Sequence, residues 1–207
     1  MEKSKISAKY RQKGRDSFET RLNLFLFQET INNRLSDNVT GIEFENGIFA
    51  NELIELYTTQ YFQLDYEYRI QGKAIKDIWQ EMTLWKKEHV EVVEILQEHY
   101  LAKIFPKIFP EEEFALLFME EEDRKCHYCG VTEAKIKALM QKRKLYKKRE
   151  RGFTLEIDRK KPNLEYSLDN SVLCCYWCNN AKTDEFCDKE FEAVGKAIGA
   201  IWDYRLR

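Results

Sequence analysis

Hydrophobic residues recur along much of the chain at steps of three and four positions, the period of an amphipathic helix. Residues 1–40 and residues 50–104 carry this pattern most clearly, and a break is expected near Gly72. Between them, alternation followed by Asn46-Gly47 predicts a small hairpin or turn over residues 41–49. We expect the apolar stripes to face a core. Their members are Phe18, Leu22, Phe25, Leu26 and Ile31, then Ile75, Ile78, Trp79, Met82, Trp85, Val92, Leu96 and Tyr100.

The pattern changes after Pro106 and Pro110, which are expected to end the helical region. The elements expected beyond them are a basic helix over residues 132–150, strands over 153–157 and 171–174, and a short helix from about Tyr176. The last stretch is amphipathic again, and Gly195 and Gly199 share one helical face that would permit close packing. The chain therefore predicts a mainly helical α+β fold, with a helical part over residues 1–120 and a second part over 121–207.

Composition supports a folded protein, because hydrophobic residues make up 43% of the 207 positions. No apolar run reaches the roughly 18–20 residues of a membrane span. No apolar stretch of signal-peptide type follows Met1, so we expect a cytoplasmic protein without membrane contact. The net charge of −2 hides a strong asymmetry, since Lys135–Lys161 holds twelve Lys or Arg against three acids. This segment predicts an anion-binding face, with a solvated basic helix as the alternative.

Two Cys-x-x-Cys pairs, Cys126/Cys129 and Cys175/Cys178, carry the clearest chemical signal. The two-residue gap lets both thiolates of a pair reach one ion, and two pairs complete a tetrahedral four-thiolate site, the usual form of structural zinc. The 45 residues between the pairs indicate that the zinc would join distant segments. A closed site of this kind leaves no open position for catalysis. Cys174 is expected to be a small core residue.

The residues around the second pair resemble the HNH (ββα-metal) nuclease family. The matching features are Asp158 at a strand end, Pro162, the loop residue Asn170, Cys175/Cys178 followed by Asn179, and Lys182. The upstream cysteine pair matches members with a four-cysteine zinc site, and the resemblance spans about residues 126–182. It implies a helical N-terminal part joined to a C-terminal ββα-metal module that carries this zinc site.

The resemblance also implies site roles. Asp158 and Asn179 would hold a catalytic divalent ion, Mg²⁺ or Mn²⁺, through their side-chain oxygens. Asn170 would orient the catalytic groups, and Lys182 would contact phosphate unless it is an ordinary surface lysine. The basic run would contact the DNA backbone without reading its sequence. Its members are Lys142, Arg143, Lys144, Lys147, Lys148, Arg149 and Arg151.

Arg159 departs from the family pattern, in which a histidine general base follows the aspartate. A guanidinium is a poor base, but it binds phosphate well. Two other side chains are candidates for the base. His127 lies between the first two cysteines, and Tyr166 lies in the loop before Asn170. A histidine titrates nearer neutral pH, whereas a tyrosine would need its pKa lowered by Arg159 and the metal.

The sequence thus predicts a metal-dependent DNA endonuclease of HNH type, as found in restriction or phage defence, with RNA as another possible substrate. Two alternatives stay open. One is a non-catalytic zinc module that binds nucleic acid, and the other is a subunit of a defence complex that a partner activates. The helical N-terminal region would supply target recognition, a homodimer contact or a protein partner's binding surface.

Overall fold

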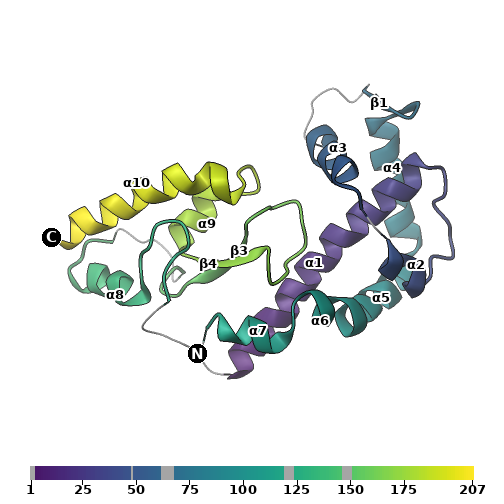
Figure 1. The fold of residues 1–207 in the computed structure, drawn as a ribbon. Helices are drawn as coiled ribbons and strands as arrows, with labels where there is room; N and C mark the ends of the chain where they lie inside the picture. The colour runs from purple at the N-terminus through teal and green to yellow at the C-terminus, as the bar shows by residue number, and fades with distance from the viewer. Residues whose placement is uncertain (1–2, 48, 62–67, 119–123, 146–150) are drawn as a thin grey trace. The chain divides into compact units, whose positions relative to one another are not determined.

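The computed structural model describes residues 3–47, 49–61, 68–118, 124–145 and 151–207, and it confirms the mainly helical α+β fold. The chain divides into two compact units (Figure 1). The helical unit is Arg11–Ile108, and the C-terminal unit combines Met1–Tyr10 with Phe109–Arg207. The predicted division of the chain into a helical part, residues 1–120, and a nuclease part, residues 121–207, stays a prediction. Within the described residues, no helix combines the length and apolar character that a membrane crossing needs.

The helical unit is built around aromatic side chains, in line with the predicted apolar stripes. The ring of Phe44 lies 5.8 Å from that of Phe18 and 5.4 Å from that of Phe25 between centroids. Trp79 departs from its predicted stripe, because it is 37% exposed. Its elements are the part of α1 (Lys3–Ile31) from Arg11 onward, α2 (Gly41–Asn46), α3 (Asn51–Tyr61), β1 (Arg69–Ile70), β2 (Lys73–Ala74), α4 (Ile75–Glu88), α5 (Val90–His99), a π-helical turn η1 (Tyr100–Ile104) and α6 (Phe105–Ile108).

The hairpin predicted over residues 41–49 is wrong, because residues 41–46 form helix α2. A capping box starts this helix. The Thr40 hydroxyl accepts a hydrogen bond from the Glu43 amide, and the Glu43 carboxylate accepts one from the Thr40 amide. Two amides that a helix start leaves unpaired are thereby satisfied. The local signal of Thr40 and Glu43 outweighed the turn signal of Asn46-Gly47.

The predicted break at Gly72 is confirmed as the tight turn between β1 and β2, where Gly72 has a φ of +86°. The second predicted helix is itself divided at His89, whose φ of −114° and ψ of 40° leave the helical region. The predicted helix end is wrong for Pro106 but holds near Pro110, because α6 ends at Ile108. Pro106 lies inside α6, and Pro110 is the N-cap of α7 (Glu111–Leu116).

The C-terminal unit contains the predicted ββα order. After α7 come α8 (Glu133–Gln141), β3 (Glu156–Arg159), β4 (Ser171–Cys174), α9 (Tyr176–Lys182) and α10 (Asp188–Leu206). β3 and β4 pair antiparallel, with Asp158 opposite Val172. Strand β4 and the start of α9 are confirmed. β3 lies later than predicted, because Gly152 turns the chain at a φ of +93° and Phe153 stays exposed. The basic helix ends at Gln141, earlier than predicted.

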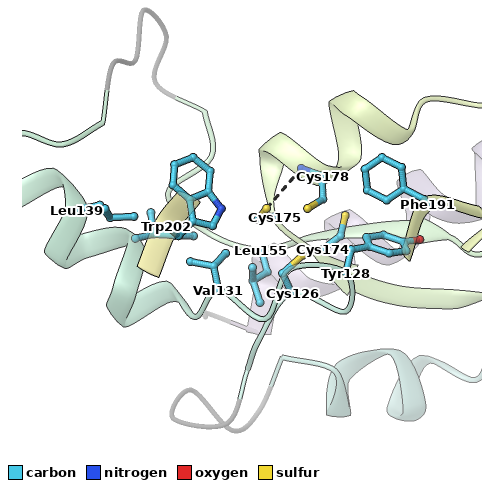
Figure 2. Packing of buried hydrophobic residues seen from close by; sticks show 11 residues of the cluster. Cys126, Tyr128, Val131, Leu139, Leu155, Cys174, Cys175, Cys178, Phe191 and Trp202 are labelled. Atoms are coloured by element: carbon cyan, nitrogen blue, oxygen red, sulfur yellow. Dashed lines mark hydrogen bonds between the residues drawn. The ribbon is translucent and has the colours of Figure 1, made fainter. Parts of the chain in front are cut away.

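Helix α10 packs against the loop of the first cysteine pair. A methyl group added at Gly195 would lie 2.7 Å from the carbonyl oxygen of Tyr128, and one at Gly199 would lie 2.6 Å from that of Cys129. Such approaches are closer than real side chains allow, so the predicted close packing of the glycine face is confirmed. Figure 2 shows the core beside this contact, whose members include Tyr128, Phe191, Trp202 and the cysteines Cys126, Cys174, Cys175 and Cys178.

Candidate metal centre and active site

The cysteine cluster consists of Cys126, Cys129, Cys175 and Cys178, whose sulfur atoms all lie within 4.8 Å of one another. Four thiolates held about 2.3 Å from a tetrahedral zinc ion would be separated by roughly 3.8 Å. The Sγ atoms of Cys129 and Cys175 are 3.6 Å apart, close to this separation. Three of the cysteines are buried and Cys129 is half-buried. The predicted pairing of the two motifs in space is therefore confirmed, and the cluster is compatible with structural zinc.

Local backbone hydrogen bonds orient the side chains of both cysteine pairs toward one another. The Cys126 amide donates to the carbonyl of Val131, and the Gly130 amide donates back to the carbonyl of Cys126, which closes the first loop. On the other side, Cys175 is the N-cap of α9, and its sulfur accepts a hydrogen bond from the Cys178 amide at 3.5 Å (Figure 2). Hydrogen bonds from the other thiols lower the pKa of Cys126. A metal ion bound in the cluster would take all four sulfur atoms as thiolates.

Asp158 is a buried carboxylate in the candidate active site, with 8% of the residue exposed. Its Oδ2 atom accepts a hydrogen bond of 2.6 Å from the Tyr128 hydroxyl. The ammonium of Lys182 lies 3.3 Å from the same oxygen and donates to the Arg159 carbonyl at 2.8 Å. Within the described part of the chain, the second carboxylate oxygen, Oδ1, accepts no hydrogen bond. The carboxylate is thus held from one side.

Asn179 and Lys182 lie one turn apart on α9 and both contact β3. The Asn179 side-chain amide donates to the Glu156 carboxylate at 2.7 Å. Glu156 also pairs with Arg151 through two hydrogen bonds of 2.8 Å. Burial acts to raise the pKa of Glu156, but the hydrogen bonds from Arg151 and Asn179 outweigh it and lower that pKa overall. Glu156 therefore stays ionised and fixes the orientation of the Asn179 amide.

Asn170 organises the loop that joins β3 to β4. Its side-chain oxygen accepts from the Lys161 amide at 2.9 Å. Its side-chain nitrogen donates to the carbonyls of Lys161 and Glu165, at 3.1 and 2.9 Å. The buried side chain therefore satisfies backbone groups at both ends of the loop. This arrangement shapes the segment that carries Tyr166.

The structure brings Arg159 and Tyr166 together. The Arg159 guanidinium lies 5.1 Å from the centre of the Tyr166 ring and donates to the Leu164 carbonyl at 3.3 Å. Tyr166 is buried. His127, the other candidate base, is exposed, and its ring packs edge-on against Tyr128 with 5.0 Å between centroids. Tyr166 is therefore a buried candidate beside Arg159, and His127 is an exposed candidate beside Tyr128.

The predicted nucleic-acid residues do not all lie on an open surface. The prediction that Lys182 contacts phosphate or lies on the surface is wrong. The side chain is fully buried, and its ammonium contacts the Arg159 carbonyl and the Asp158 carboxylate. Arg151 is 58% exposed and is paired with Glu156. Exposed positions are kept by Lys142, Arg143 and Lys144. Lys147, Lys148 and Arg149 lie outside the described residues.

Sequence reasoning missed Tyr128, Glu156 and the buried role of Lys182. Glu156 precedes Asp158 by two positions, and residues two apart on a strand point to the same face. That spacing was a usable signal. Tyr128 gave none, because its contact with Asp158 joins positions thirty residues apart along the chain.

Comparisons with known proteins add one structural similarity. No protein-family model matches the chain, and no curated protein matches it. Among solved structures, the chain is similar to the rare-cutting HNH restriction endonuclease PacI, with 22% identity and a TM-score of 0.41. The match covers 70% of this chain and 91% of that one.

Proposed function

We propose that the C-terminal unit is a metal-dependent endonuclease of the HNH type that hydrolyses phosphodiester bonds in DNA. The observation that carries this proposal is the double attachment of α9 to β3. Lys182 pairs with Asp158, and Asn179 pairs with Glu156. Both pairings leave one oxygen each of Asp158 and Asn179 without a hydrogen-bond donor among the described residues. A carboxylate oxygen and an amide oxygen on neighbouring elements suit a divalent cation.

Two metals of different roles fit these donor sets. Zn²⁺ suits the four thiolates of the cysteine cluster and would fix the first cysteine loop to α9. Mg²⁺ or Mn²⁺ suits Asp158 and Asn179, where it would neutralise charge on the scissile phosphate and its leaving oxygen. Asp158 and Asn179 would hold that ion, and Asn170 would keep the loop beside it in place. Arg159 would bind a phosphate oxygen through its permanently charged guanidinium.

The proton acceptor is proposed to be His127 or Tyr166. His127 is exposed, so its imidazole ring is open to solvent. Tyr166 is buried, and its ring centre lies 5.1 Å from the Arg159 guanidinium. The two are separated by the pH dependence of single-turnover cleavage in His127→Ala and Tyr166→Phe. The variant that loses both rate and the acidic limb of the profile identifies the acceptor.

The substrate class follows from charge. Exposed Lys142, Arg143 and Lys144 follow α8, and they would supply affinity for a phosphate backbone without reading sequence. The same contacts serve RNA, so RNA cleavage is an outcome for which the assay tests. A role in restriction or phage defence, and contacts of the helical unit with target, second copy or partner protein, belong to the same proposal.

A non-catalytic nucleic-acid-binding module is the second candidate function, and one observation favours it. The Lys182 ammonium lies beside Asp158, where it supplies positive charge that a divalent cation would otherwise bring. In this alternative the lysine would take the place of the ion permanently. Binding of DNA without cleavage, equal in the presence of Mg²⁺ and EDTA, is its signature.

The test is plasmid cleavage by the full chain with Mg²⁺, Mn²⁺ or EDTA, beside Asp158→Asn. This change keeps the shape of the side chain and removes its charge. We expect metal-dependent nicking or linearisation, lowered at least about 100-fold in the variant, which corresponds to about 2.7 kcal/mol. Asp203→Asn is the control, because Asp203 is an exposed aspartate of α10 that pairs only with Lys135 among the described residues. Cleavage that survives Asp158→Asn would remove Asp158 from the site.

A further inference from the structure

Tyr128 joins the two candidate metal sites. It lies between two members of the cysteine cluster, Cys126 and Cys129, and its hydroxyl donates to Asp158 Oδ2 at 2.6 Å in a buried contact. A short hydrogen bond from a hydroxyl to a carboxylate is among the stronger ones in proteins. The position of the hydroxyl therefore bears directly on the position of the Asp158 carboxylate.

The tyrosine has little freedom to move. Its ring packs edge-on against Phe191 at 5.2 Å between centroids. Its backbone and Cβ lie where a side chain at Gly195 would be, so α10 passes directly over it. The cysteines on either side belong to the cluster, and the residue itself is 6% exposed. The conformation of the cysteine loop thus determines where the hydroxyl points.

We propose that Tyr128 is a positioning residue, whose hydroxyl fixes the Asp158 carboxylate so that the cysteine loop sets the affinity of the divalent-cation site. This inference rests on the proposed function, since it concerns the same cation. The hydroxyl occupies Oδ2 and leaves Oδ1 as the oxygen for the ion. Without the hydroxyl, Lys182 would be the one side chain among the described residues that still holds the carboxylate, which would then be free to turn Oδ1 away.

The test is Mn²⁺ binding to the full-length, zinc-loaded protein, measured from the electron paramagnetic resonance signal of free Mn²⁺. Tyr128→Phe removes one oxygen and keeps the ring that packs against Phe191. We expect Mn²⁺ affinity to fall about 10-fold or more, the usual effect of losing a partner that orients a metal ligand. Zinc content, measured by elemental analysis, should stay equal to wild type. Tyr204→Phe, at a tyrosine of α10 that is 76% exposed, is the matched control and should bind Mn²⁺ as wild type does.

A double-mutant cycle separates positioning from a general structural effect. If Tyr128 acts through Asp158, then Tyr128→Phe should add no further loss of Mn²⁺ affinity in protein that already carries Asp158→Asn. Equal losses in both backgrounds would overturn the inference, as would unchanged affinity in Tyr128→Phe or a wild-type protein that binds no Mn²⁺.

Plasmid cleavage is followed in parallel, so that the two proposals fail separately. Metal-dependent cleavage with unchanged Mn²⁺ affinity in Tyr128→Phe keeps the nuclease and removes the positioning role. Lowered affinity without any cleavage by wild type keeps the positioning role and removes the nuclease.

Discussion

Replacing Lys182 by methionine tests how much the buried ion pair between Lys182 and Asp158 stabilises the protein. The Lys182 side chain is fully buried, and its ammonium lies 3.3 Å from a carboxylate whose side chain is only 11% exposed. Methionine keeps the apolar length of the side chain but removes the charge and the hydrogen bond to the Arg159 carbonyl. The change therefore leaves the Asp158 carboxylate buried without its cation.

The expected cost follows from this geometry. Breaking a buried ion pair by removing one partner costs about 3–5 kcal/mol. Asp158 keeps the hydrogen bond from Tyr128 and some contact with solvent, so we expect the lower end, about 3 kcal/mol. Urea unfolding of zinc-loaded protein at pH 7, followed by tryptophan fluorescence, measures it, since Trp177 and Trp202 both lie in the C-terminal unit.

Two further variants complete this experiment. Lys196→Met removes an exposed lysine of α10 and should change the free energy of unfolding by less than about 0.5 kcal/mol. In protein that carries Asp158→Asn, the cost of Lys182→Met should shrink by at least about 1 kcal/mol, because the pair is already broken. A loss below about 1 kcal/mol in Lys182→Met alone would refute the importance of the buried pair.

Three other predictions address the cysteine cluster, the glycine face and the Glu156 contacts. Cys129→Ser should lower the bound zinc below one equivalent by elemental analysis, whereas Cys187→Ser, outside the cluster, should keep wild-type zinc; equal zinc in both would contradict the four-cysteine site. Gly199→Ala places a methyl group 2.6 Å from the Cys129 carbonyl oxygen and should destabilise the protein by about 1–3 kcal/mol, against almost no change for Ala200→Ser at an exposed position of α10. Arg151→Met removes a cation that lowers the pKa of Glu156 in the folded protein. The stability that the Arg151–Glu156 pair gives the folded protein should therefore be fully present above the ordinary glutamate pKa of 4.5. It should be lost as the pH falls from there through the lowered pKa of the folded state. Because Arg151 is 58% exposed, the difference at pH 7 should stay under about 1 kcal/mol in urea unfolding, and the same difference at pH 3 would contradict the pairing.

The parts of the site that could be predicted from the sequence depend on residues only a few positions apart along the chain. A Cys-x-x-Cys pair fixes its own geometry over four residues, so the cluster follows once two such pairs lie in one fold. Strand β4 and the start of α9 follow from an apolar run ending at a cysteine that caps a helix. The glycine face of α10 was also visible, because two glycines four positions apart share a side of a helix.

The parts that could not be predicted depend on contacts between distant positions or on competing local signals. Residues 41–46 carried a turn signal and a capping box together, and the structure forms the capping box and also packs Phe44 into the aromatic core. A lysine near the end of a short helix is ordinarily exposed, and Lys182 is buried because α9 lies directly on β3. In the sequence, Tyr128 is one of two residues between Cys126 and Cys129. Its hydrogen bond to Asp158 is visible only in the structure.

The charges of the candidate site balance before any cation is present. Asp158 is matched by Lys182, Glu156 by Arg151, and Arg159 by Asp184. A divalent cation would therefore meet side chains whose formal charges sum to zero, rather than an acidic cluster that attracts it. A phosphate of a bound nucleic acid would add to the cation affinity that the free protein has, since two charges a few ångströms apart in a partly buried site interact by several kcal/mol. In the free protein, Lys182 and Tyr128 keep the Asp158 carboxylate in place.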